Sequence, residues 1–148
     1  MKPKGSHLSY YDLRDAELYD AYKAALPNYA MPDGSTDYWG AIREAVVSPC
    51  SRYWISEGMA YSKIRWMLQD PEAVESMVEN KKRMYKSLLK VYLKMRSDPA
   101  LAELSDRQIA YMASDTPAPE FFLTPGSAHI HICAERKRRL MARLNIKK

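Results

Sequence analysis

The chain has 148 residues, of which 47% are hydrophobic and 28% are charged, and this balance is typical of a globular protein rather than a disordered one. The length fits one ordinary domain or two very small ones. No apolar run approaches the roughly 20 residues that span a bilayer, and the N-terminus lacks the apolar stretch of a signal peptide, so we expect a cytoplasmic protein with no membrane partner. The two cysteines are too few for a disulfide framework.

The spacing of apolar residues and turn residues predicts an all-α protein. Residues 1–10 carry no periodic signal and are expected to form an N-terminal arm. A first helix is predicted over residues 12–26, and a second follows Thr36 or Asp37, either of which can cap it. Ser56 is placed to cap a third helix.

The pair Asp70-Pro71 is a typical helix start, because aspartate caps the first turn and proline at the first position gives up no hydrogen bond. No breaker follows before Asp98-Pro99, which predicts a helix of roughly 25 residues, well above the usual mean. We expect this long helix, over residues 70–97, to join two halves of the chain. Ser105–Gln108 matches a capping box that opens a further helix, and Thr124-Pro125 opens the last one.

One motif occurs twice, at Ser48–Ile64 and again at Thr116–Ile132. We interpret it as an internal duplication into two related, helix-turn-helix-like halves, whose aromatic residues anchor each core, with base stacking as the alternative role. The matching residues are Pro49, Tyr53, Trp54 and Ser56 in the first copy and Pro117, Phe121, Phe122 and Thr124 in the second. The expected segments are an arm over 1–10, a first repeat over 11–69, a connecting helix over 70–97, a second repeat over 98–143 and a basic tail over 144–148.

The block Ser48–Ser56 reads S-P-x-x-R-Y-W-I-S and resembles a pattern, S-P-A-P-R-F-Y-V-S, in small uncharacterised proteins of bacteriophages and mobile elements. The second copy looks like the same block with Glu120 in place of the arginine. This resemblance implies a phage or mobile-element origin without a defined activity. Separately, a helix, a tight turn and a capped second helix are similar to a helix-turn-helix arrangement, in which the helix after the turn enters the major groove of DNA.

Basic residues concentrate in the second part of the chain: residues 81–148 contain 15 basic and 6 acidic residues, against 8 and 12 in residues 1–80. A positive segment attracts polyanions. Four lysines recur at a spacing of four in the expected long helix, namely Lys82, Lys86, Lys90 and Lys94. Like charges at this spacing destabilise an isolated helix, so an anionic partner such as nucleic acid would explain them, and a solvated lysine face is the alternative.

The C-terminal segment is rich in arginine, whose guanidinium pairs bidentately with phosphate oxygens. Its candidate phosphate-binding residues are Arg136, Lys137, Arg138, Arg139 and Arg143. The alternatives are a favourable interaction with the helix dipole and a role in solubility. In the first motif copy, Lys63 and Arg65 lie on the helix that would contact DNA in a helix-turn-helix arrangement.

His129, His131 and Cys133 do not predict a metal site, because only His129 and Cys133 share a helical face and two ligands do not make a zinc site. The sequence contains no phosphate-binding loop, nucleophile elbow or paired-acid constellation. We therefore expect no metal, no cofactor and no enzymatic activity.

Two functions from different classes remain. The first is a non-enzymatic nucleic-acid-binding protein of phage or mobile-element type, which acts in the cytoplasm, that of the host if a phage encodes it. The second is a virion or assembly protein that contacts other protein chains, which the 11 tyrosines and 9 methionines favour because both residue types are common at interfaces. A continuous basic face would favour the first function, and a large exposed apolar patch would favour the second.

Overall fold

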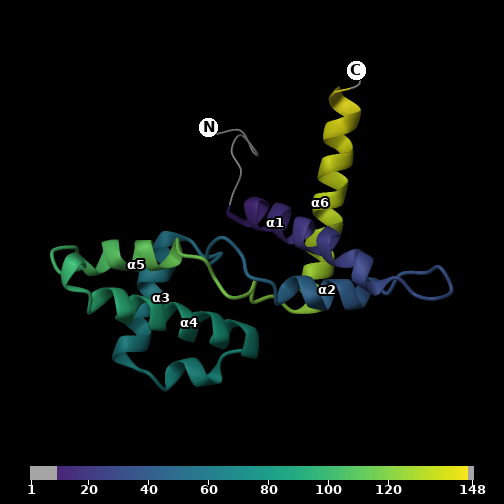
Figure 1. Ribbon diagram of the computed structural model, residues 1–148. Helices are drawn as coiled ribbons and strands as arrows, with labels where there is room; N and C mark the ends of the chain where they lie inside the picture. The colour runs from purple at the N-terminus through teal and green to yellow at the C-terminus, as the bar shows by residue number, and fades with distance from the viewer. Residues whose placement is uncertain (1–9, 147–148) are drawn as a thin grey trace. The chain divides into compact units, whose positions relative to one another are not determined.

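The computed structural model describes residues 10–146 and the side chains of residues 11–145. Over this range the protein is all-helical, with six α-helices and no strand, which confirms the predicted class (Figure 1). The α-helices are α1 (Tyr10–Ala25), α2 (Tyr38–Val46), α3 (Glu57–Gln69), α4 (Glu79–Arg96), α5 (Asp106–Ser114) and α6 (Pro125–Ile146). Three short 3-10 helices occupy Leu26–Tyr29, Ala73–Ser76 and Pro99–Leu101.

The expected arm and tail fall mostly at the edges of the described range. Helix α1 begins at Tyr10, so residues 1–9 of the expected arm lie outside the described residues. Helix α6 continues through Ile146, so the expected tail over 144–148 begins as helix, and Lys147 and Lys148 lie outside the described residues. Within the described part of the chain, no helix combines the length and the apolar character that a membrane span requires.

Local capping residues set several of the helix starts. The side chains of Asp37 and Ser56 each accept a hydrogen bond from the backbone N–H three residues on, at the starts of α2 and α3. The Ser105 hydroxyl accepts from the N–H of Gln108 at 3.1 Å, and the Gln108 side chain accepts from the N–H of Ser105 at 2.9 Å. The predicted capping box of α5 is therefore confirmed.

The long helix predicted over residues 70–97 is wrong in its first part. Asp70 does not start a helix but ends α3, because its N–H donates to the Trp66 carbonyl. A 3-10 turn follows, residues 77 and 78 are extended, and α4 begins only at Glu79. The cause is tertiary: Val74 is buried, and the Glu75 carboxylate contacts both Lys82 and Lys86. In one continuous helix Lys82 and Lys86 would lie roughly 10 and 16 Å beyond Glu75 along the helix axis. The chain must therefore turn back between Glu75 and these lysines for the contacts to form.

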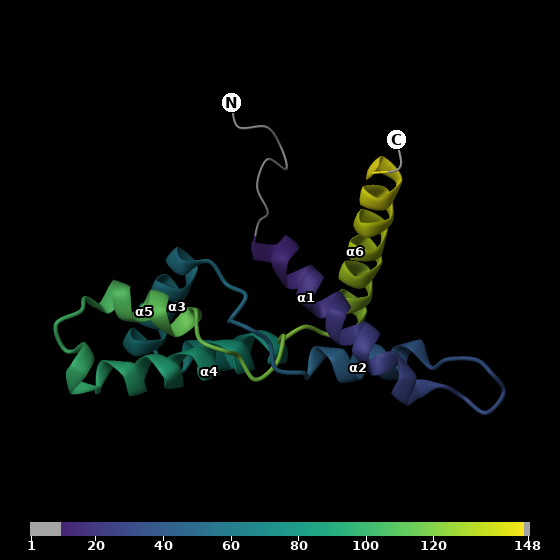
Figure 2. The same ribbon diagram turned by 45° about the horizontal axis from the view of Figure 1, so that its top comes forward.

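The helices pack into two compact three-helix units. Helices α1, α2 and α6 form one unit, over residues 10–48 and 123–146, and α3, α4 and α5 form the other, over residues 49–122 (Figure 2). The chain passes from one unit to the other after α2 and returns after α5. These units divide the chain at other points than the expected segments 11–69 and 98–143. Helix α4 packs with α3 and α5 as a member of one unit and does not act as a connector.

Several structural features recur at the motif shift, the displacement along the chain that carries Ser48 onto Thr116. At this shift both bounds of α2 fall on those of α5, and the first residue of α3 falls on the first residue of α6. Thr124 accepts from the N–H three residues on, as Ser56 does in the first copy. Cys50 and Ala118, which the same shift relates, form an antiparallel bridge in which each N–H donates to the other carbonyl at 3.0 Å.

The motif aromatics of both copies are buried in the α3–α4–α5 unit, so the prediction that each pair anchors the core of its own half is wrong. Tyr53, Trp54, Phe121 and Phe122 each have 9% or less of their surface exposed. The rings of Tyr53 and Phe122 stack with centroids 6.0 Å apart, and the Tyr53 hydroxyl pairs with the Ser87 hydroxyl. Phe122 has a φ of 57°, and its carbonyl accepts a hydrogen bond from the Asn80 side chain. Rings buried in this way serve core packing and cannot stack on bases.

Candidate nucleic-acid interface

Half of the predicted lysine stripe on α4 is neutralised by carboxylates. Lys82 Nζ lies 3.3 Å from Glu79 and 3.6 Å from Glu75, and Lys86 Nζ lies 2.6 Å from Glu75. The hydrogen bond to Glu79 raises the pKa of Lys82, and the hydrogen bond from Lys86 lowers the pKa of Glu75. Lys90 and Lys94 are exposed, and neither has an ion pair within the described residues.

The two basic residues predicted on α3 lie against aromatic rings. Lys63 Nζ lies 4.8 Å from the centroid of the Trp66 ring and 5.8 Å from that of Tyr85. The Arg65 guanidinium lies 5.5 Å from the centroid of the Tyr61 ring. Such cation–π contacts orient the side chains but leave their charge in place.

Two of the predicted arginines of α6 hold this helix against α1. Arg139 contacts Glu135 at 2.7 Å and Asp20 at 2.9 Å, and Arg138 contacts Glu135 at 3.0 Å and Asp12 at 3.6 Å. The hydrogen bond to Glu135 raises the pKa of Arg139. Because Glu135 is buried, its charge requires these partners, so Arg138 and Arg139 have a structural role in the α1–α6 contact.

A second polar cluster joins the same two helices. The buried Arg14 donates to Asp15 and lies with its Nη2 atom 3.1 Å from His131 Nε2, while His131 Nδ1 lies 3.3 Å from Asp15. Arginine has no acceptor, so Nε2 of His131 accepts from Arg14 and Nδ1–H donates to Asp15. This arrangement leaves the buried charges of Arg14 and Asp15 both hydrogen-bonded.

The remaining basic residues of α6 are free to meet an anion. Arg136, Lys137 and Arg143 are exposed, and none forms an ion pair within the described residues. Arg136 lines a pocket of about 650 Å³ between α1, α2 and α6, and Lys23 of α1 lines it too. Arg136 is among the phosphate-binding residues predicted from the sequence, whereas Lys23 is not.

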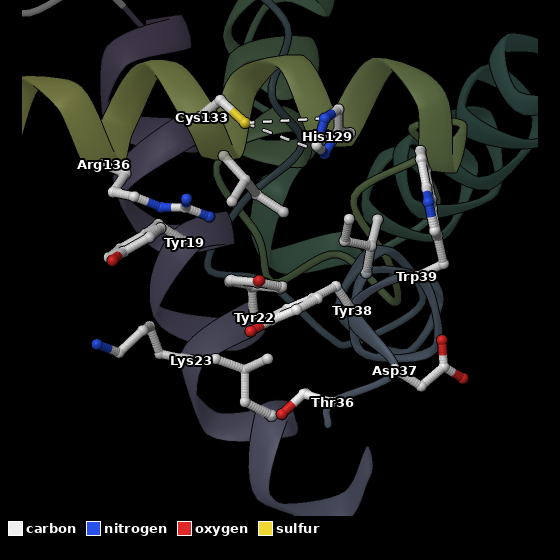
Figure 3. Close-up of a pocket in the computed structure, with 13 residues that line it drawn as sticks. Tyr19, Tyr22, Lys23, Thr36, Asp37, Tyr38, Trp39, His129, Cys133 and Arg136 are labelled. Atoms are coloured by element: carbon white, nitrogen blue, oxygen red, sulfur yellow. Dashed lines mark hydrogen bonds between the residues drawn. The ribbon is translucent and has the colours of Figure 1, made fainter. Parts of the chain in front are cut away.

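The pocket has a basic side and an aromatic side. Figure 3 shows Arg136, Lys23 and Tyr19 on one side, with Trp39 and His129 on the other. The centroids of the Trp39 and His129 rings are 5.1 Å apart, which holds the indole in place. A cationic side opposite an aromatic side suits an anionic ligand that also has a flat ring.

Tyr22 and Tyr38 lie between these two sides (Figure 3). Burial raises the pKa of Tyr22, against a smaller opposing effect of the Arg136 charge. The Tyr22 hydroxyl therefore stays protonated at neutral pH and can donate a hydrogen bond. Tyr38, by contrast, is an exposed residue at the start of α2.

Asp37, the one carboxylate among the described residues that line the pocket, already has partners for its charge. Asp37 Oδ1 accepts a hydrogen bond from the N–H of Gly40 at 3.0 Å, and Asp37 Oδ2 lies 3.8 Å from Arg43. The negative charge is thus compensated by the N-terminus of α2 and by an arginine. The pocket is therefore positive on the side of Lys23 and Arg136.

A smaller hollow of about 360 Å³ continues this surface along α6. It is lined by Tyr19, Lys23, Arg136, Arg139 and Arg143, three of which also line the larger pocket. The Tyr19 ring lies between Lys23, at 5.7 Å from its centroid, and Arg139, at 4.7 Å. Basic residues from two helices thus surround one tyrosine.

Cys133 and His129 lie next to each other on the pocket wall. The Cys133 sulfur lies 3.9 Å from His129 Nε2 and 4.0 Å from His129 Nδ1, at helical spacing of four residues. In the described part of the chain, no group of three or more His, Cys, Asp or Glu residues is placed to hold a metal ion.

The sequence patterns missed most of the pocket because its residues come from three helices. Tyr38 and Trp39 read as ordinary apolar positions of a helix, yet 57% of Tyr38 and 47% of Trp39 are exposed. Only the packing of α2 against α1 and α6 reveals that they face a hollow. Searches of protein-family models, of curated proteins and of solved structures find no match to this chain.

Proposed function

We propose that the protein binds nucleic acid through the α1–α2–α6 unit, without catalysing a reaction. Lys23, Arg136 and Arg143 are assigned to phosphate contacts. The observation that carries the proposal is the pocket of about 650 Å³ with cations on one side and aromatic rings on the other. Such a combination of positive charge and stacking rings is characteristic of sites for single-stranded nucleic acid.

Charge supports the assignment of phosphate contacts to this unit. Lys23, Arg136 and Arg143 have no carboxylate partner within the described residues, whereas Lys82 and Lys86 of α4 are paired. An ion pair inside the protein must be broken or shared before the cation can bind a phosphate. A phosphate contact made by Lys23, Arg136 or Arg143 therefore releases more counterions from the nucleic acid than one made by Lys82 or Lys86.

We also propose that the two halves of the chain arose by duplication in a phage or mobile-element protein. Support comes from the α2 and α5 bounds, the α3 and α6 starts and the Cys50–Ala118 bridge, all of which follow the motif shift. Leu18 and Tyr22 of α1 are buried at the same spacing as Leu88 and Tyr92 of α4. The displacement along the chain from Leu18 to Leu88, and from Tyr22 to Tyr92, is slightly longer than the motif shift. This is expected if the loops of the two halves differ in length.

The test of nucleic-acid binding is a titration of the wild type with duplex and single-stranded oligonucleotides at two or more salt concentrations. The variant Lys23→Gln/Arg136→Gln/Arg143→Gln should flatten the slope of log affinity against log salt, by about 0.7 per lost contact on single strands and about 0.9 on duplex. The matched control, Lys81→Gln/Lys90→Gln/Lys94→Gln, removes the same charge from exposed residues of α4. Equal slopes for the two triple variants, or no binding by the wild type at low salt, would contradict the proposal.

One observation favours the second function, a protein of virion or other assemblies. Leu140, Met141 and Leu144 share a face near the end of α6, and each is about half exposed at 48–50%. Exposed apolar faces of this kind commonly contact other protein chains. Under this function the wild type would form larger species by light scattering, and the variant Leu140→Ser/Leu144→Ser would abolish them while leaving nucleic-acid affinity unchanged.

A further inference from the structure

We infer that the pocket between α1, α2 and α6 takes one nucleotide unit, with its base against Trp39 and Tyr38 and its phosphate between Lys23 and Arg136. The inference rests on the proposed function and specifies its ligand as an unstacked nucleotide, supplied either by a single strand or as a free mononucleotide. Its basis is the arrangement of aromatic and basic side chains in Figure 3.

The volume of the pocket limits the ligands that it can hold. The volume of about 650 Å³ lies within the range of about 300–1,000 Å³ that is usual for sites of small ligands and cofactors. A base inside a duplex has both faces covered by its neighbours, so it cannot offer a face to a side-chain ring. The pocket can therefore receive a base only from a single strand, a strand end or a free nucleotide.

The rings provide the surface for the base. More than half of Tyr38 and nearly half of Trp39 are exposed, at the first turn of α2, where the capping Asp37 fixes the backbone. The indole is also held by its contact with the His129 ring of α6. An exposed, pre-oriented pair of rings costs little ordering entropy when it binds a flat ligand.

The opposite side provides the phosphate contacts. Arg136 can form two parallel hydrogen bonds to phosphate oxygens, and Lys23 adds a point charge from α1. Tyr22, which lies between the two sides, keeps its proton and can donate a further hydrogen bond. The smaller hollow toward Arg143 gives the next phosphate of a strand a path out of the pocket.

Two measurements test the inference. The first is the intrinsic fluorescence of Trp39 in a Trp66→Phe background, where the other remaining tryptophan, Trp54, is buried in the α3–α4–α5 unit. Adenosine monophosphate and an oligodeoxyadenylate decamer should quench this fluorescence on binding. The second is the affinity of the same ligands and of a duplex decamer, measured by anisotropy or calorimetry.

We expect Tyr38→Ala and Trp39→Leu each to weaken binding of the decamer by about 5- to 140-fold, the range that corresponds to one lost base–ring contact. The matched control is Tyr11→Ala, because Tyr11 is exposed to the same extent as Tyr38, at 57%. This control should leave affinity unchanged. Both pocket residues are exposed, so their variants should melt within a few degrees of the wild type, and this is checked by circular dichroism.

The outcomes distinguish a failure of the nucleotide-pocket inference from a failure of the proposed nucleic-acid binding. Tighter binding of the decamer than of adenosine monophosphate identifies the ligand as a strand, and equal binding per site identifies it as a free nucleotide. If Tyr38→Ala and Trp39→Leu both bind the decamer and the mononucleotide within twofold of the wild type, while the loss of Lys23, Arg136 and Arg143 still weakens binding, the pocket inference is wrong and the proposed function stands. If the wild type binds none of these ligands at low salt, both are wrong.

Discussion

Replacing Gly40 with alanine should destabilise the α1–α2–α6 unit, because the new methyl group has no room. Its Cβ would lie 2.4 Å from Cδ1 of Tyr29 and 2.6 Å from Oδ2 of Asp37, well inside van der Waals contact. The Tyr29 ring cannot move freely, since its hydroxyl donates to Glu44 at 3.2 Å. Asp37 is likewise held, as the cap of α2.

The magnitude follows from these contacts. Overpacking costs about 1–3 kcal/mol, and disturbing the cap costs about a further 1 kcal/mol. Replacing glycine with alanine inside a helix by itself stabilises the helix by about 0.5–1 kcal/mol, which offsets part of this loss. We therefore expect Gly40→Ala to lower the free energy of unfolding by about 1–3 kcal/mol.

Urea unfolding followed by far-ultraviolet circular dichroism measures this loss. The control is Gly58→Ala, because a Cβ at Gly58 meets no atom within 4 Å, and this variant should be as stable as the wild type or slightly more stable. Adding Tyr29→Ala to Gly40→Ala removes the ring and should restore part of the loss, so the two changes should couple by about 0.5–3 kcal/mol. A Gly40→Ala protein as stable as Gly58→Ala, or strictly additive effects in the double variant, would refute the reasoning.

Two further predictions concern the α3–α4–α5 unit. Trp54→Ala and Phe122→Ala should each lower the free energy of unfolding by about 3–5 kcal/mol through the cavity left in the core. Trp54→Phe should cost much less than Trp54→Ala, since the buried indole N–H has no hydrogen-bond partner among the described residues, and equal losses in urea unfolding would contradict this. The pKa of Glu75 is lowered from 4.5 by Lys86, so its ion pairs stabilise the protein above pH 4.5 and lose this effect as the pH falls through the lowered pKa. The melting temperatures of the wild type and Glu75→Gln should therefore differ at pH 7 and converge toward pH 3, and a difference independent of pH would show that the pairs do not contribute.

Features set by neighbouring residues were predictable from the sequence. The capping box of α5 depends only on Ser105 and Gln108, and both of its hydrogen bonds are present. The Ser56 and Thr124 caps are equally local. The all-helical class follows from apolar spacing, which is also a short-range property.

Features set by distant residues were not predictable in this way. Asp70-Pro71 has the local pattern of a helix start, but the burial of Val74 and the two ion pairs of Glu75 delay the start of α4 to Glu79. Arg139 has one partner at local helical spacing, Glu135, but its second partner, Asp20, lies far away in the chain, on α1. A sequence pattern contains no information on which helix will lie opposite, so it cannot separate paired cations from free ones.

The order of the helices along the chain also constrains how the protein is made. Helices α1 and α2 precede α3, α4 and α5 along the chain, but the third member of their unit, α6, follows them. Its synthesis ends roughly 100 residues after that of α2, or about 5–20 s later at the usual rates of translation. The α3–α4–α5 unit is continuous in sequence and can fold while the chain is still growing. During that interval α1 and α2 can pack against each other, but the faces that contact α6 have no partner, so chaperones or an aggregating neighbour have access to them. The pocket needs residues of all three helices, so a growing chain that still lacks α6 cannot bind the ligand that we propose.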